Sequence, residues 1–99
     1  MKIKTRRFHE VATYNFAEWL KTQLARKQMK QSKLAKLLNV NVMTVSGWVC
    51  GDGKHMPRMT SIWRMCVILQ DDEYTASDLF DSACMALKSD LMHMQFPDQ

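Results

Sequence analysis

The stretch QSKLAKLLNVNVMTVSGW, residues 31–48, decides the fold expected for this chain. Its first half has the leucine spacing of a helix, and the small side chain of Ala35 lets a second helix approach closely. Asn39 tolerates the positive φ that a tight turn requires. Val40 can anchor that turn in the core, and Asn41 can accept the free amide hydrogens of a following helix. The stretch therefore predicts two short helices joined by a tight turn.

Capping residues and hydrophobic spacing predict three further helices around this pair. Asn15 with Glu18 three residues later is typical of a helix start, and a basic run up to Lys30 suits the end of that helix. Ser77 is the expected cap of the last helix. The predicted helices cover about 15–30, 31–38, 41–49, 59–69 and 77–94. We expect an all-α fold of five helices, in which residues 1–14 form a basic arm or short strand.

Residues 31–48 resemble the helix-turn-helix of the Cro/repressor-type (XRE-like) DNA-binding domains. The resemblance is carried by Gln31, Leu34, Ala35, Leu38, Val40, Thr44, Val45, Ser46, Trp48 and Gly51. It extends more loosely over residues 15–80, and it implies a Cro-like DNA-binding domain there. It also implies a cytoplasmic transcriptional regulator of bacterial or phage origin, and a repressor in particular. In that family the helix after the turn enters the major groove.

The resemblance assigns roles by position. The expected base-contacting residues are Asn41, Val42, Met43, Ser46 and Gly47. The expected DNA backbone contacts are Gln31, Lys33, Thr44, Lys54, His55 and Arg58. Members of the family commonly place polar side chains at the two leading positions of this helix. Here Val42 and Met43 stand there and donate no hydrogen bonds, although an apolar side chain can contact a thymine methyl group. Part of the specificity is therefore expected from DNA shape.

The charge distribution is consistent with a polyanionic partner. Residues 1–33 carry nine basic and two acidic side chains, whereas residues 67–99 carry one basic and seven acidic. A basic front and an acidic tail are typical of a protein that meets nucleic acid with one face. The same asymmetry also fits a solvated helical surface. RNA is the weaker nucleic-acid hypothesis, because the aromatic side chains that stack bases on a sheet are missing.

The final helix carries a seam that indicates a homodimer. Its apolar residues step by four and three along the chain, as in a heptad pattern. The members of this expected dimer interface are Phe80, Cys84, Leu87, Leu91 and Met94. A second apolar strip, formed by Leu79, Ala83 and Ala86, lies beside it. Because one small domain does not easily bury both strips, residues 77–99 are expected to dimerise, unless both strips pack on the domain's own core.

Other functional classes find little support in the residues. The three cysteines are an odd number without metal-ligand spacing, so free thiols in a reducing cytoplasm are expected and zinc is not. Cys50, Asp52 and His55 lie close together, but no fourth ligand follows. No catalytic motif, cofactor signature, membrane span or secretory signal is evident, and no small-molecule ligand is expected. The alternative to a DNA-binding regulator is a protein-interaction module on the same fold, an antirepressor or a regulator's partner.

Overall fold

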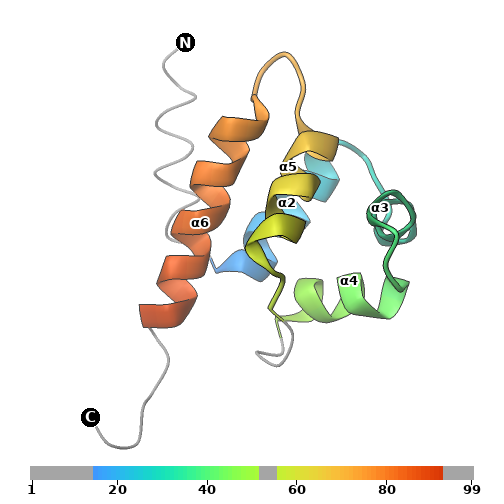
Figure 1. Ribbon diagram of the computed structural model, residues 1–99, viewed down its shortest axis with the longest axis horizontal. Coiled ribbons are helices and arrows are strands. Elements are labelled where there is room, and N and C mark those ends of the chain that lie inside the picture. The colour runs from blue at the N-terminus through green and yellow to red at the C-terminus, as the bar shows by residue number, and fades with distance from the viewer. Residues whose placement is uncertain (1–14, 52–55, 93–99) are drawn as a thin grey trace, which may run out of the picture.

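The computed structural model describes residues 15–51 and 56–92, and in these ranges it contains five helices and no strand. The helices are α2 (Phe16–Arg26), α3 (Gln31–Leu38), α4 (Val42–Cys50), α5 (Met59–Leu69) and α6 (Ala76–Met92). The all-α prediction is confirmed for these ranges. The expected N-terminal strand or arm lies outside the described residues. In Figure 1, α5 and α6 run side by side in opposite directions, and α3 and α4 lie to one side of them.

A single core joins all five helices. Trp19 of α2 is fully buried, and its indole Nε1 donates a hydrogen bond of 2.8 Å to Ser82 Oγ of α6. Ser82 in turn donates to the carbonyl of Leu79 at 3.0 Å, so both polar groups are satisfied inside the core. The remaining core side chains are mostly Leu, Ile, Met and Ala, with Trp48 contributed by α4. Both Trp19 and Trp48 are therefore core residues.

The caps explain where most helices begin. Asn15 Oδ1 accepts the amide hydrogen of Glu18 at 2.9 Å, which confirms the predicted start of α2. The prediction for α6 was wrong in detail, because Ser77 lies inside the helix. Thr75 is the cap instead: its Oγ1 accepts from the Asp78 amide, and the Asp78 carboxylate accepts from the Thr75 amide. This reciprocal pair is a capping box. The expected end of α6 at Met94 lies outside the described residues.

The end of α2 also differs from the prediction. The helix stops at Arg26 rather than near Lys30, because Gln28 adopts a left-handed backbone with φ 52°. The Gln28 amide bonds back to the carbonyl of Ala25, and the Met29 amide bonds to that of Leu24. These two bonds form a Schellman motif, and the Met29 side chain packs against the core beside it. Lys30 therefore belongs to the start of α3, not to the end of α2.

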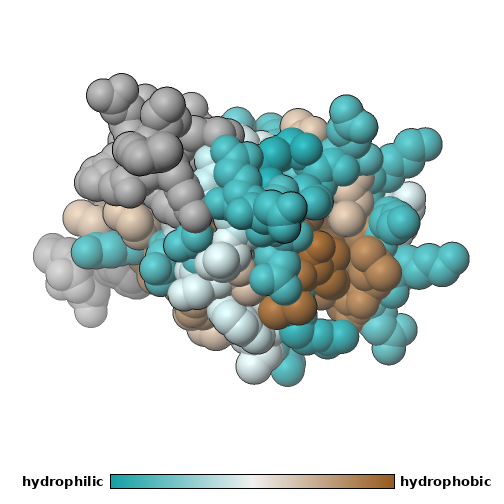
Figure 2. Space-filling model, turned by 90° about the horizontal axis from the view of Figure 1, so that it is seen from above, coloured by the Kyte–Doolittle hydropathy of each residue, from teal (hydrophilic) through white to brown (hydrophobic). Residues whose placement is uncertain are grey.

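The C-terminal helix is part of the common core. Leu79, Ala83 and Ala86 are fully buried, so the domain covers this strip with its own side chains. The Phe16 amide at the start of α2 donates to Asp90 Oδ2 of α6 at 3.0 Å, which ties the two helices together at that end. Several large apolar side chains nevertheless stay exposed, and Figure 2 shows apolar surface (brown) next to hydrophilic surface (teal).

The three cysteines are free thiols. Cys66 is fully buried in α5, and burial raises the pKa of its thiol to about 12. Burial also raises the pKa of the Cys84 thiol in α6, with a smaller effect from the charge of Asp81. A thiol with a raised pKa stays protonated at neutral pH and behaves as a small apolar group.

A charged cluster links the end of α2 to the loop between α5 and α6. The Arg26 guanidinium bonds to the Asp71 carboxylate and to the carbonyl of Leu69, and it lies 4.9 Å from the ring centroid of Tyr74. Asp71 also accepts hydrogen bonds from the amides of Tyr74 and Glu73. Burial alone would raise the pKa of Asp71, but these hydrogen bonds and the Arg26 charge outweigh it and hold the pKa at about 2.

This cluster makes stability depend on acid pH. Because the pKa of Asp71 is lowered on folding from its ordinary 3.8 to about 2, its contribution is complete above the ordinary value and is lost as the pH falls toward 2. We expect the free energy of unfolding, measured in urea between pH 5 and 2, to fall less steeply for Asp71→Asn than for the unmodified chain. Asp72→Asn is the control, since Asp72 is exposed and has no hydrogen bond within the described ranges. An equal slope for Asp71→Asn and the unmodified chain would contradict this account.

Candidate nucleic-acid interface

The connection between α3 and α4 orients the candidate site. Asn39 has φ 60° and ψ 46°, the left-handed backbone that the sequence predicted. Its amide bonds to the carbonyl of Lys36, and the Val40 amide bonds to that of Ala35 at 3.0 Å. Val40 is half-buried and packs against the core, also as predicted. Only residues 39–41 separate the two helices, so their relative direction is set by these backbone bonds.

The start of α4 presents its side chains to solvent. Asn41 Oδ1 accepts the Met43 amide hydrogen at 2.8 Å, which confirms Asn41 as the cap and occupies its oxygen. Val42 is 44% exposed and Met43 is 74% exposed, so neither belongs to the core. One turn later, Ser46 and Gly47 are half-buried. The opposite side of α4 inserts Val45 and Trp48 into the core.

The far end of α4 approaches α2 closely. Gly51 ends the helix with φ 67°, and its amide bonds to the carbonyl of Gly47 at 3.2 Å. A Cβ atom at Gly51 would lie 3.0 Å from Cβ of Ala17 in α2. Both the positive φ and the close contact therefore favour glycine here. Of the loop that follows, Lys54 and His55 lie outside the described residues, and Arg58 is exposed at the start of α5.

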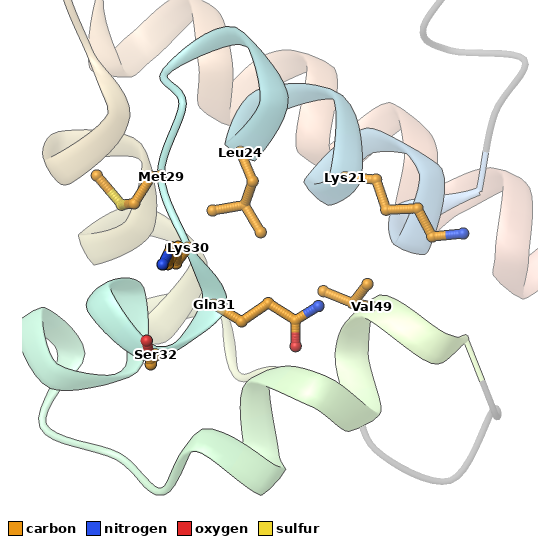
Figure 3. Close-up of a pocket in the computed structure, with 7 residues that line it drawn as sticks. All are labelled: Lys21, Leu24, Met29, Lys30, Gln31, Ser32 and Val49. Atoms are coloured by element: carbon orange, nitrogen blue, oxygen red, sulfur yellow. The ribbon is translucent and has the colours of Figure 1, made fainter.

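The start of α3 faces an open pocket of about 490 Å³ between α2, α3 and the end of α4. Figure 3 shows Gln31 reaching from the start of α3 across this pocket toward Val49 of α4. Lys30 is the cap residue, but its side chain makes no capping hydrogen bond to the first turn. A helix start carries a partial positive charge and free amide hydrogens, which favour an anion. Thr44, another predicted backbone contact, is half-buried on α4.

Four lysines lie together beside this helix start. Lys27, Lys30, Lys33 and Lys36 line a second open pocket of about 620 Å³. Lys27 is 3.5 Å from the Asp71 carboxylate, whereas Lys30, Lys33 and Lys36 have no acidic partner within the described ranges. Only Lys33 was predicted as a site residue. The available signal was a lysine at every third position from 27 to 36. It was missed because the first helix was expected to continue to Lys30, which assigned the first two of these lysines to a different helix from the last two.

Apart from Thr44 and Arg58, the predicted residues that the structure describes fall into two groups. The α4 group combines exposed Asn41, Val42 and Met43 with half-buried Ser46 and Gly47. The α3 group combines Gln31 and Lys33 with the lysines around them. The α3 group can hold an anion by charge, and the α4 group offers apolar contact with few donors. Within the described ranges, no group of three or more His, Cys, Asp or Glu side chains is arranged to hold a metal ion. In the same ranges, no helix has both the length and the apolar character to cross a membrane.

Comparisons with protein-family models, curated proteins and solved structures give no match for this chain.

The left-handed turn gives a direct test of what orients α4. We expect Asn39→Val to lower the free energy of unfolding by about 1–2 kcal/mol, because a β-branched side chain clashes with the backbone at positive φ. Asn39→Gly is the matched control and should stay within about 1 kcal/mol of the unmodified chain, since glycine adopts this backbone freely. Urea unfolding followed by circular dichroism measures both. A valine variant as stable as the glycine variant would show that the turn does not depend on this conformation.

Proposed function

We propose that this chain is a sequence-specific double-stranded DNA-binding transcriptional regulator whose α3 and α4 form a helix-turn-helix of the Cro/repressor type. In this proposal α4 enters the major groove and the start of α3 meets the phosphate backbone. The observation that carries it is the exposed start of α4 on the same helix pair as Lys33 and Lys36, which have no acidic partner within the described ranges. The protein acts as a homodimer on a partly palindromic operator, and represses.

The α3 side of the surface supports backbone binding. Lys30, Lys33 and Lys36 have no acidic partner within the described ranges, so binding a phosphate would break no ion pair there. The uncapped start of α3 adds amide hydrogens that suit a phosphate oxygen. Such contacts position a protein on DNA without reading its sequence. Affinity is therefore expected to fall steeply with salt, as lysines release counterions from DNA.

The α4 side supports limited base reading. With the Asn41 oxygen used in the cap, its amide nitrogen remains as a donor toward a base edge. Val42 and Met43 offer methyl and methylene groups, which match the methyl group that thymine alone among the four bases carries in the major groove. The expected operator therefore has thymines where these two side chains approach it.

A protein-interaction module is the second candidate, and exposed apolar side chains favour it. Leu37 of α3 is 47% exposed, and Val42 and Met43 are exposed near the same turn. These side chains would suit an apolar groove of another regulator. Loss of a protein complex in Met43→Ala, with the DNA affinity of the chain unchanged, would favour this function over DNA reading.

The central experiment selects bound sequences from a random pool of double-stranded DNA and then measures affinity for the selected operator across salt concentrations. We expect an enriched half-site, repeated about one helical turn apart, and a linear fall of log affinity with log salt concentration. The absence of any enriched sequence, or an affinity that does not change with salt, would overturn the proposal.

The backbone contacts predict a uniform loss of affinity. Lys33→Gln and Arg58→Ala should each weaken binding to the operator and to unrelated DNA by a similar factor. The slope of log affinity against log salt concentration should also become less steep, by about one for each phosphate contact that the variant loses. Fluorescence anisotropy at four salt concentrations measures both quantities. Lys88→Gln on α6 is the matched control and should change neither. A variant that weakened only the operator would instead assign its residue to base reading.

The apolar start of α4 predicts a dependence on thymine methyl groups. Replacing the contacted thymines by deoxyuracil removes only the methyl group, and should weaken binding about fourfold for each methyl, since burying one carbon gives about 0.8 kcal/mol. In Met43→Ala, deoxyuracil at the position that Met43 contacts should no longer weaken binding. The base preferred at that position in the selected sequences should also change. Lys33→Gln should keep the full loss. Equal affinity of the unmodified chain for both operators would exclude methyl reading.

A further inference from the structure

An exposed apolar strip runs along the α5–α6 pair. On α5, Met59, Trp63 and Val67 are spaced by four residues, so they lie on one side of the helix. All three are exposed, although all are large and apolar; Trp63, the largest, is 43% exposed.

The strip continues onto α6 without a break. The Trp63 ring meets the ring of Phe80 edge-on, with 5.5 Å between centroids and an interplanar angle of 82°. Phe80 and Cys84 are half-buried and Leu91 is exposed on the same side of α6, while Leu87 between them is only 8% exposed and belongs to the core. We call the side chains of Met59, Trp63, Val67, Phe80, Cys84 and Leu91 the α5–α6 strip.

One charged residue flanks the aromatic contact on each helix. Arg64 follows Trp63, and Asp81 follows Phe80, so each lies about 100° further round its helix. Because α5 and α6 run in opposite directions (Figure 1), both steps turn away from the contact between the helices. Both residues are exposed, which puts Arg64 on the outer flank of α5 and Asp81 on the outer flank of α6. Neither forms an ion pair within the described ranges.

We propose that a second copy of this chain docks on the α5–α6 strip, with a twofold axis parallel to these helices. The rotation lays α5 of each copy on α6 of the other. It brings the Trp63–Phe80 pairs together at the centre and sets Arg64 opposite Asp81 of the partner subunit on both sides. The interface is therefore a bundle of four helices, not a seam of α6 alone. The inference rests on the proposed function for its role, since a dimer would present two copies of α4 to one operator.

Charge complementarity selects a second copy as the occupant. A twofold interface pairs each position of a surface with a different position of the same surface. Around the Trp63–Phe80 contact the strip has one positive flank at Arg64 and one negative flank at Asp81, equally placed about that contact, so its centre is complementary to itself. The exposed Lys88 lies two turns further along α6, away from this centre. The apolar centre of the strip matches the composition of homodimer interfaces, whose buried cores are depleted of charge.

Reversing each charge separately tests this arrangement. The chain and its variants are studied without DNA by sedimentation velocity at several concentrations, with circular dichroism to confirm equal helix content. The unmodified chain should be a dimer. Arg64→Asp places like charges at both flanks, and so does Asp81→Arg, so each should raise the dimer dissociation constant at least tenfold. The matched control Lys36→Asp, a reversal on α3, should leave the dimer unchanged.

Mixing the two variants identifies the pairs as intermolecular. In a mixed dimer, Arg64→Asp supplies two acidic flanks and Asp81→Arg supplies two basic flanks, so both pairs are restored. An equimolar mixture should therefore dimerise although each variant alone does not. A monomeric unmodified chain, dimeric single variants, or a mixture that stays monomeric would each overturn the inference.

The test of the α5–α6 interface and the test of DNA binding can fail independently. The single variants keep the α3–α4 surface, so a monomer should still bind a DNA duplex that carries one half-site, and should lose the added affinity for two half-sites. Binding to one half-site with an unchanged dimer in both variants would overturn the α5–α6 interface and leave DNA binding intact. A dimer that depends on these two charges, in a chain that does not bind DNA, would support the α5–α6 interface and overturn the proposed function.

Discussion

Left-handed backbone at the helix ends is the constraint on which the rest of this fold depends. A residue with positive φ follows the end of each of α2, α3 and α4, and these residues are Gln28, Asn39 and Gly51 in that order. At each end, backbone amides return to carbonyls of the last turn, so the chain changes direction within a few residues. Without these stops, α2 and α3 would continue in their own directions, and neither α3 nor α4 would lie on the core that α2, α5 and α6 build.

The same constraint explains how well the sequence predicted the helices. Asn39 is a residue type that favours positive φ, and Asn41 is a good cap. The bounds of α3 were therefore predicted correctly, and the start of α4 was displaced by one residue. The bounds of α5 were also predicted, from its apolar spacing. Gln28 has no such preference, so the end of α2 was missed and Lys30 was placed in the wrong helix. Its left-handed backbone depends on the packing of Met29, a tertiary contact that local sequence does not encode.

The candidate site could be predicted in part for a related reason. The positions of Asn41, Val42 and Met43 follow from the turn, and all three are exposed as a groove-facing helix requires. The lysine cluster depends on how α2 ends, so three of its four members were not identified. The sequence does not define the exposed apolar side of α5, because Ile62, Met65 and Cys66 already supply a buried face. Only the packing of α6 shows that Met59, Trp63 and Val67 are left outside it.

The short connection between α3 and α4 also limits how this chain can diverge. One residue inserted at positions 39–41 would interrupt the turn that sets the direction of α4, in which the amides of Asn39 and Val40 bond back to α3 and Asn41 directly follows as the cap. The longer turn would displace α4 from α3, although Val45 and Trp48 must still reach the core. Related chains could exchange the side chains on the exposed side of α4, and under the proposed function this would change what the helix recognises. They are not free to change the number of residues in this turn, so new recognition can arise by substitution but not by insertion.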